Sequence, residues 1–229
     1  EKIYHSMLVN PAMMASARHD NILIIGGGDG LALRDVLTWN PKLVILLDLD
    51  EELVDFFTHL NSANDNKAFI KMNGGAFSDP RVQTIFGDAW LGVDLLIAEG
   101  KRFDAIIVDL PDPNHPDLNK LYSTGFYNKL RHVLTGDGAL VVQSTSPYHA
   151  KRTFLSIGKT IEASGFSQVD QYHANVPSFG EWGWTIAVPL GAAPKTRIKN
   201  FKGPLPESWA TREMIEASFV FGRNFFTNK

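Results

Sequence analysis

The chain has 229 residues, of which 44% are hydrophobic and 21% charged, enough for one large domain with a full core. It contains no cysteine, which excludes disulfides and thiolate chemistry and fits a reducing compartment such as the cytoplasm. The formal net charge of −3 offers no basic footprint for nucleic acid, and no apolar run approaches the ~20 residues of a membrane-spanning helix.

Residues 1–17 form the N-terminal segment, EKIYHSMLVNPAMMASA. Its apolar residues predict a short amphipathic segment that packs on the core. On this interpretation Tyr4 and His5 are ordinary half-buried side chains.

The stretch Asn21–Val36 has the pattern of a nucleotide-binding turn. Ile22–Ile25 predicts a strand buried on both faces, and a helix opens at Leu31. Between them stand Gly26, Gly27, Gly28, Asp29 and Gly30. A strand, a glycine turn and a helix start are the parts of such a site, because glycines let the backbone approach a ligand closely.

A second buried strand, Lys42–Asp50, carries Asp48 twenty residues past Gly28. An acidic side chain at about this distance can accept hydrogen bonds from ribose hydroxyls. Asp50 then caps the helix expected over Glu52–Leu60. Residues 61–80 are polar and predict a loop.

The third strand, Arg81–Phe86, ends in Gly87-Asp88-Ala89. At the carboxyl end of this strand Asp88 can bond the exocyclic amine of a purine. A role for Asp88 as the N-cap of a helix over Trp90–Glu99 is an equally good interpretation.

The fourth strand, Phe103–Asp109, runs directly into Leu110-Pro111-Asp112-Pro113. We then expect a loop over 114–118, a helix over 124–134 and a fifth strand over 139–143. A helix over 151–164 and two late strands over 169–173 and 184–188 follow. The segment 175–183 between the late strands is too rich in glycine, proline and aromatic residues for a simple hairpin turn.

Strands and helices alternate as far as Gln143, which predicts an α/β fold with a parallel sheet and right-handed crossovers. The two late strands suggest a closing hairpin with one antiparallel strand. This is the plan of the seven-stranded, mostly parallel Rossmann-like sheet of class I S-adenosylmethionine-dependent methyltransferases, with helices on both faces. We expect one domain, with a core over 18–190 and a C-terminal extension over 191–229. In the extension, a solvated basic loop over 195–202 precedes an apolar helix over 212–221.

Five aspartates fall where the expected strands end, at the edge where open α/β sheets bind ligands. They are Asp29, Asp48, Asp88, Asp109 and Asp112. The loops there supply no basic residue, which argues against a pyrophosphate cofactor such as NAD. The pattern favours a nucleoside without phosphates that carries a cationic group, as in S-adenosylmethionine and its relatives.

Asp109 and Asp112 form the constellation of greatest interest. A turn at Asp112-Pro113 that Asp109 caps is the simpler interpretation, and it explains Asp112 better than Asp109. A charge at the end of a buried strand is costly unless it is used. Two nearby carboxylates repel, so one of them is expected to hold its proton more tightly and to act as a base toward an ammonium substrate.

Motifs across nearly the whole chain together resemble the spermidine synthases, the polyamine aminopropyltransferases. They are GGGDGLALRDVL at 26–37, LLDLD at 46–50, GDA at 87–89, VDLPDP at 108–113 followed by Pro116, LYS at 121–123, and Tyr4-His5. VPSFGEWGW and ASFVFG are similar to the bacterial subgroup that carries a membrane-embedded region before the catalytic domain. The chain departs from the family pattern at Ser6, Asn10, Gly125 and Phe179, and we expect the family's small N-terminal β-domain to be absent.

The resemblance implies transfer of an aminopropyl group from decarboxylated S-adenosylmethionine, a co-substrate, to putrescine, with no tightly bound cofactor and no metal. Donor binding would fall to Gly26, Gly27, Gly28, Asp29 at the ammonium, Asp48 at the ribose, Asp88 and Ala89 at the adenine, and Pro116. Asp109 would be the general base, and the diamine would contact Tyr4, His5, Asp29, Asp109, Asp112 and Gln143. A homodimer, and a location at the cell membrane for a longer protein, are compatible with the family.

Two alternatives stay open. The first is a methyltransferase that uses S-adenosylmethionine itself. Asp29 separates it from aminopropyl transfer, because a carboxylate there repels the methionine carboxylate and accommodates the bare ammonium. The second is a non-catalytic polyamine- or nucleoside-binding protein, motivated by the missing β-domain and by Ser6 and Asn10.

Overall fold

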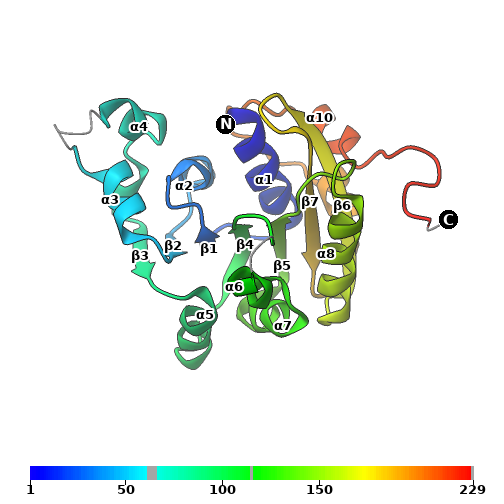
Figure 1. Cartoon of the computed structure of the whole chain (residues 1–229), viewed down its shortest axis with the longest axis horizontal. Helices are drawn as coiled ribbons and strands as arrows, with labels where there is room; N and C mark the ends of the chain where they lie inside the picture. The colour runs from blue at the N-terminus through cyan, green and yellow to red at the C-terminus, as the bar shows by residue number, and fades with distance from the viewer. Residues whose placement is uncertain (61–65, 114–115, 228–229) are drawn as a thin grey trace.

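The computed structural model describes residues 1–60, 66–113 and 116–227. A seven-stranded sheet runs through them with helices on both faces (Figure 1). Its strand order is β3-β2-β1-β4-β5-β7-β6. The strands are β1 (Asn21–Gly26), β2 (Leu43–Asp48), β3 (Val82–Phe86), β4 (Phe103–Asp109), β5 (Leu134–Gln143), β6 (Gln168–Val176) and β7 (Gly180–Val188).

The pairing confirms the expected α/β class. Strands β1 to β5 are parallel, and β7 lies antiparallel between β5 and β6. The helices are α1 (Lys2–Ala15), α2 (Leu31–Leu37), α3 (Glu51–Thr58), α4 (Lys67–Met72), α5 (Ala89–Ala98), α6 (Pro116–Asn119), α7 (Thr124–Val133), α8 (Lys151–Ala163), α9 (Pro194–Asn200) and α10 (Arg212–Ala217), with 3-10 turns η1 (Ala76–Ser78) and η2 (Lys120–Tyr122).

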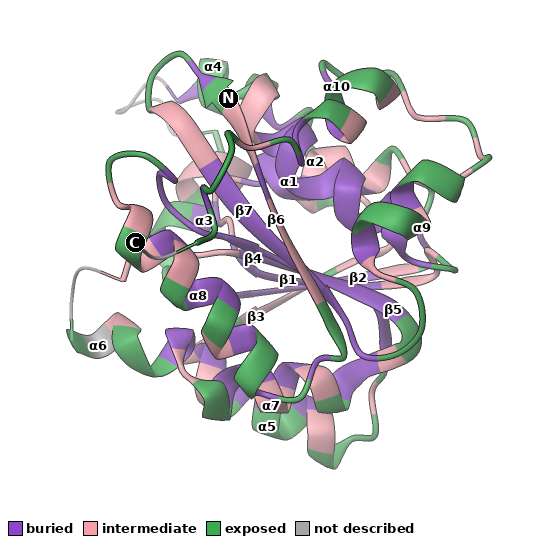
Figure 2. Ribbon diagram, turned by 90° about the vertical axis from the view of Figure 1, so that its right-hand side faces the viewer, coloured by how far each residue is buried: buried purple, intermediate pink, exposed green. Residues whose placement is uncertain are grey.

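Two hydrophobic layers sandwich the sheet, and Figure 2 shows the buried strands between them. Successive side chains of a strand point to opposite faces. In β1, Ile22 and Ile24 therefore face the layer built with α1, α2 and α9. Leu23 and Ile25 face the layer built with α5, α7 and α8. Burial on both faces explains why the parallel strands read as continuous apolar runs.

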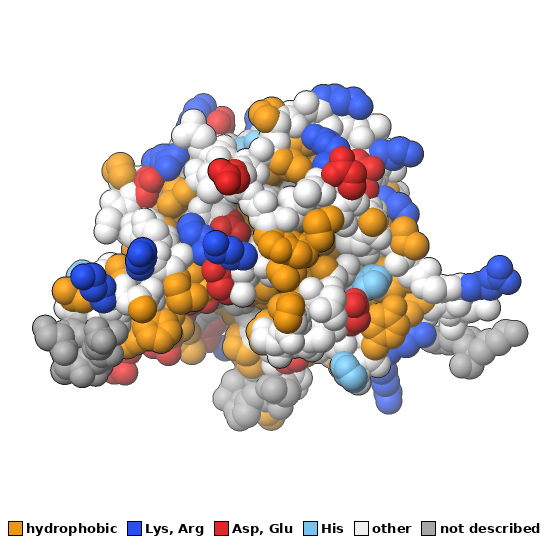
Figure 3. Space-filling view, turned by 90° about the horizontal axis from the view of Figure 1, so that it is seen from above, with side chains coloured by type: hydrophobic (Ala, Val, Ile, Leu, Met, Phe, Trp, Pro, Cys, Tyr) orange, Lys and Arg blue, Asp and Glu red, His pale blue; other side chains and the backbone are white. Residues whose placement is uncertain are grey.

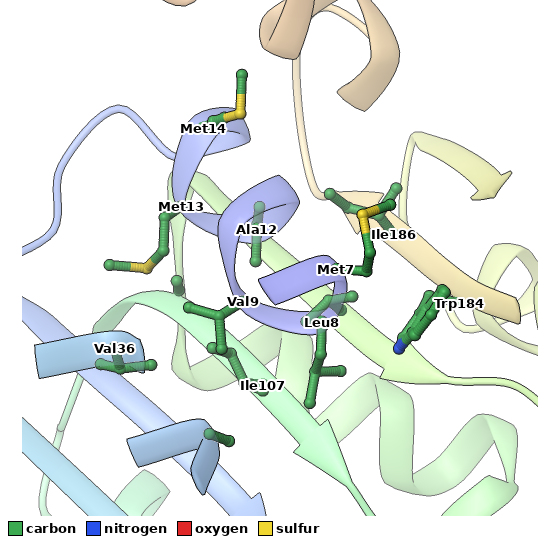
Figure 4. Close-up of a cluster of buried hydrophobic side chains, with 14 of the residues drawn as sticks. Met7, Leu8, Val9, Ala12, Met13, Met14, Val36, Ile107, Trp184 and Ile186 are labelled. Carbon is green, nitrogen blue, oxygen red and sulfur yellow. The ribbon is translucent and has the colours of Figure 1, made fainter. Parts of the chain in front are cut away.

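Helix α1 is part of the core. Every residue from His5 to Ala15 is buried, so the expectation of an amphipathic segment is wrong. Leu8 and Val9 lie among apolar side chains from the sheet and from α2 (Figure 4). Asn10 links the helix to two distant parts of the chain. It accepts a hydrogen bond from Trp39 at 3.0 Å and donates one to Ser208 at 2.9 Å. This embedding fixes the position of the helix's first turn.

Four further expectations are wrong, three for the connecting segments and one for the start of the fifth strand. Part of the loop predicted over 61–80 folds into α4 and η1, and 116–119 form the single turn α6. Strands β6 and β7 keep pairing as far as Val176 and Gly180, so the connection is a short hairpin turn. Strand β5 begins at Leu134, which pairs with Phe103 ahead of a register shift. The predicted loops at 61–65 and 114–115, and the end of the extension at 228–229, lie outside the described residues.

The basic run of the C-terminal extension is helix α9 and not a solvated loop. Pro194 opens this helix, where its fixed φ is favourable. Arg197 donates to the carbonyl oxygens of Ala15 at 3.1 Å and Asp137 at 2.9 Å. The extension is thereby tied to the end of α1.

The face shown in Figure 3 carries acidic, basic and apolar side chains mixed together. Within the described residues, no helix is both long enough and apolar enough to cross a membrane. The membrane-embedded region expected ahead of this domain is not tested by that finding and stays a prediction of the resemblance.

Candidate active site

A cavity of about 970 Å³ opens at the carboxyl ends of β1, β2 and β4. Its lining includes nearly all the predicted site residues: Tyr4, His5, Gly26, Gly27, Gly28, Asp29, Asp48, Asp88, Ala89, Asp109, Asp112 and Gln143. Pro116 is the exception, because it is exposed at the start of α6 and is not among the lining residues. The structure thus brings together side chains that lie more than a hundred residues apart in the sequence.

The glycine turn packs directly against two of the aspartates, Asp109 and Asp48. Gly26 has φ +79°, and a Cβ there would clash with the Asp109 carbonyl group. A Cβ on Gly28 would lie 2.9 Å from an oxygen of the Asp48 carboxylate. Only glycine therefore lets β1 end this close to β2 and β4.

Asp109, at the end of β4, is an ionisable group on which several neighbours act in opposite directions. The Tyr4 hydroxyl donates to its Oδ1 at 2.6 Å, and His5 Nε2 lies 3.9 Å from its Oδ2. Burial raises the pKa of Asp109, as do the Asp29 and Asp48 charges, whereas His5 and the Tyr4 hydrogen bond lower it. The expected repulsion therefore comes from Asp29 and Asp48 and not chiefly from Asp112.

Tyr4 and His5 do not fit the interpretation as ordinary half-buried residues, because α1 holds both against Asp109. Burial and the Asp109 charge raise the pKa of Tyr4 well above its usual value, so its hydroxyl stays a donor. His5 Nδ1 lies 2.9 Å from the Glu1 carbonyl oxygen. That oxygen can only accept, so Nδ1 carries a proton and Nε2 is the ring nitrogen that faces Asp109.

Asp48 and Asp50 have different surroundings, and the expected capping role of Asp50 is confirmed. Asp50 caps α3 by accepting from the Leu53 N–H at 2.9 Å. Asp48 is nearly buried and accepts from the Asp50 N–H at 2.8 Å. Burial raises the pKa of Asp48, while backbone N–H groups, that of Gly28 among them, lower it. A carboxylate on the cavity wall, with its own backbone anchors, is well placed to accept hydrogen bonds from a ligand.

Asp88 has two donors already. It caps α5 by accepting from the Trp90 N–H at 2.8 Å, which confirms the alternative N-cap interpretation. Its second oxygen pairs with Lys120, and this ion pair lowers the pKa of Asp88. Lys120 also lines the cavity, so the expectation that no basic residue stands at this edge is wrong.

Asp29 is held by hydrogen bonds to both its side chain and its main chain. Its Oδ1 accepts from the Leu31 N–H at 2.9 Å, at the start of α2. Its carbonyl oxygen accepts from the Asn73 side chain at 3.1 Å. The carboxylate therefore has a fixed place on the cavity wall.

Asp112 is held by two neutral donors. Gln143 Nε2 donates to its Oδ1 and Thr145 Oγ1 donates to its Oδ2, each at 3.0 Å. Gln143 is buried and also donates to the Leu110 carbonyl at 2.8 Å and to the Tyr122 hydroxyl oxygen at 3.1 Å. The Gln143 amide thus binds the loop after β4. The contacts of Thr145 with Asp112 and of Tyr122 with Gln143 were not expected from the sequence.

The site suits an organic cation. Its carboxylates are Glu1, Asp29, Asp48, Asp50, Asp88, Asp109 and Asp112. Tyr4, Phe179 and Trp182 add an aromatic wall, with ring centroids 6.0 and 5.1 Å apart in succession. Aromatic faces and carboxylates both attract ammonium and sulfonium groups. Among the described residues, no group of three or more His, Cys, Asp or Glu side chains is arranged to hold a metal ion.

Comparisons with known proteins agree with this chemistry. Residues 1–200 match the family model of the spermine/spermidine synthase domain. A polyamine aminopropyltransferase of Shewanella oneidensis is 53% identical over 230 residues, which cover 99% of this chain and 40% of the relative. Polyamine aminopropyltransferase 2 of Bacillus anthracis is 42% identical over 189 residues, which cover 82% of this chain and 50% of the relative. The chain thus spans about half or less of each relative's length.

Two solved structures have the same fold. A spermidine synthase in complex with the transition-state analogue AdoDATO superposes with a TM-score of 0.79 at 26% identity, covering 99% of this chain and 74% of that one. The spermidine synthase of Thermotoga maritima gives a TM-score of 0.78 at 25% identity, covering 99% and 73%. With its sheet order and its acidic cavity beside a glycine turn, the chain belongs to the spermine/spermidine synthase family.

Proposed function

We propose that this chain is the catalytic domain of a polyamine aminopropyltransferase. It would transfer the aminopropyl group of decarboxylated S-adenosylmethionine to putrescine and yield spermidine and methylthioadenosine. The observation that carries the proposal is the Asp109 carboxylate, held by the Tyr4 hydroxyl inside a cavity lined by further carboxylates. The names of the relatives and the AdoDATO complex of the structural neighbour support it.

The donor is proposed to lie along the glycine turn. Asp48 would accept hydrogen bonds from the ribose, and Asp88 with Ala89 would contact the adenine. Both Asp88 oxygens have donors, so the adenine amine would share or replace the Lys120 contact. Asp29 would bind the aminopropyl ammonium. Pro116 stays a prediction of the resemblance.

The acceptor amine would attack the methylene carbon beside the sulfonium. A carbon–nitrogen bond forms, the carbon–sulfur bond breaks, and the sulfur leaves as a neutral thioether. Only a neutral amine is nucleophilic, and deprotonating an amine of pKa ~10.4 at pH 7 costs roughly 4–5 kcal/mol. Asp109, whose pKa is raised, would accept that proton, while Tyr4, His5 and Asp112 align the amine.

The choice of donor tests this proposal against a methyltransferase. The measurement is the affinity of the protein for decarboxylated S-adenosylmethionine and for S-adenosylmethionine, under the same conditions. The decarboxylated form should bind more tightly, because the Asp29 charge repels the methionine carboxylate. Tighter binding of S-adenosylmethionine would favour the methyltransferase instead.

The proposed partners are a diamine and an exchangeable co-substrate. A cytoplasmic location fits a chain without cysteine and is proposed on that ground. The homodimer stays a prediction of the family resemblance.

A further inference from the structure

Thr145 has a backbone conformation that β-branched residues rarely adopt. Its φ is +58°, in the left-handed region, although its side chain branches at Cβ. The residue is buried and follows the end of β5 by two positions. Strain of this kind persists only where the surroundings impose it, and it gathers at functional sites.

The β5–β7 pairing imposes this conformation. The Ser144 N–H donates to the Gly183 carbonyl and the Gly183 N–H donates to the Thr145 carbonyl, both at 2.8 Å. The Thr145 N–H also donates to Gln143 Oε1 at 3.1 Å. A Cβ at position 183 would lie 2.9 Å from the Thr145 carbonyl oxygen and 2.5 Å from the Phe154 ring. Because residue 183 is glycine, the backbone of β7 can approach Thr145 closely enough to hydrogen-bond its carbonyl oxygen.

The constrained backbone of Thr145 directs its hydroxyl toward Asp112. The hydroxyl donates to Asp112 Oδ2 at 3.0 Å, while Gln143 donates to Oδ1 of the same carboxylate. Asp112 lines the cavity, whereas Thr145 is not among the lining residues. The Thr145 hydroxyl, which donates to Asp112, therefore acts on a ligand through that carboxylate. Because both donors are neutral, they orient the carboxylate and leave its charge for a cation.

We propose that Thr145 is a positioning residue for the acceptor, whose strained backbone aims a hydroxyl at Asp112 and so fixes the carboxylate that binds the diamine ammonium. This proposal rests on the proposed aminopropyl transfer. It predicts that the hydroxyl matters for the acceptor and not for the nucleoside, whose expected contacts lie at Asp48 and Asp88 on the other side of Asp109.

The test compares Thr145→Val with Thr145→Ser. Valine keeps the β-branched shape, and hence the same backbone cost, but lacks the hydroxyl. The Thr145→Val protein should show a KM for putrescine raised about tenfold or more, because a hydrogen bond to a charged group is lost. Its kcat should change less, and its affinity for methylthioadenosine should equal that of the parent. Thr145→Ser keeps the hydroxyl, so its KM for putrescine should stay within about threefold of that of the parent.

A double-variant cycle separates positioning from general damage. In an Asp112→Ala background, Thr145→Val should cause little further loss of kcat/KM, because the group through which it acts is gone. Equal impairment of the valine and serine variants, an unchanged KM in the valine variant, or a full further loss in the Asp112→Ala background would each overturn the proposal. A parent protein that makes no spermidine would instead overturn the proposed function, and this inference with it. Methylthioadenosine binding and thermal melting verify that each variant is folded.

Discussion

At the scale of single residues, Asp109 is caught between opposing influences. Burial and the charges of Asp29 and Asp48 favour its protonated form. The Tyr4 hydroxyl and His5 favour the carboxylate. A general base must be ionised to begin a turnover and basic enough to take a proton, and such a balance moves its pKa toward the working pH.

Tyr4→Phe tests the first of these supports. The change removes a hydrogen bond that lowers the pKa of Asp109, so that pKa should rise further. The acidic limb of kcat/KM against pH should therefore move to higher pH, and the rate below neutrality should fall. The matched control is Tyr172→Phe. The Tyr172 hydroxyl is buried and donates to the Met7 carbonyl at 2.7 Å, and it does not touch Asp109. Coinciding pH profiles for the two variants would contradict the role given to Tyr4.

Asp109→Asn should stabilise the protein at neutral pH. An acid whose pKa is raised on folding contributes stability below its unfolded pKa, and this stability is lost as pH rises through the raised value. Removing the charge relieves that loss, by roughly 2–4 °C in Tm for each kcal/mol regained. The gain should shrink as the pH falls toward the ordinary pKa of an aspartate. Melting curves of parent and variant across that pH range measure it, and a Tm lowered at neutral pH would contradict it.

At the scale of elements, the sequence was most informative about the parallel strands. Strand β4 was predicted with its observed bounds, and β1 was correctly placed, because burial on both faces leaves an uninterrupted apolar run. The aspartates at the strand ends followed from the rule that ligands bind there. These are local signals that do not depend on distant neighbours.

The closing hairpin of β6 and β7 is as expected, but two features that depend on distant neighbours are not: the full burial of helix α1 and the shortness of the turn between β6 and β7. Residues 5–15 are buried because α2, α9 and the sheet surround them, which the segment's own pattern does not encode. The hairpin keeps its pairing through Gly183, because register is fixed by the partner strand. Thr145 and Lys120 were missed for the same reason, since their side-chain partners lie more than thirty residues away in the sequence.

At the scale of the whole molecule, the cavity joins parts of the chain that lie far apart in the sequence. Its walls come from the N-terminal helix, from the ends of β1, β2 and β4, and from the β6–β7 hairpin. A nucleoside bound along the glycine turn would link these elements and stabilise the folded state by mass action.

Methylthioadenosine should therefore raise the Tm. At a concentration about one hundred times Kd the stabilisation is about 2.7 kcal/mol, or roughly 5–11 °C for a domain of this size. Asp48→Asn should lose most of that shift, because it alters the proposed ribose acceptor. Asp20→Asn is the matched control, since Asp20 is partly exposed and pairs with Lys42 at 2.9 Å. A full shift in the Asp48→Asn protein would show that Asp48 does not bind the nucleoside.

The most direct test is product formation by the parent and by Asp109→Asn from decarboxylated S-adenosylmethionine and putrescine. The parent should yield spermidine and methylthioadenosine in equal amounts, and only when both substrates are present. Asp109→Asn should turn over about 10²–10⁴ times more slowly, as expected for loss of a general base, while it still binds methylthioadenosine. A parent that binds the ligands but forms no spermidine would be a non-catalytic binding protein. That result, or an Asp109→Asn rate within a few-fold of the parent, would contradict the account.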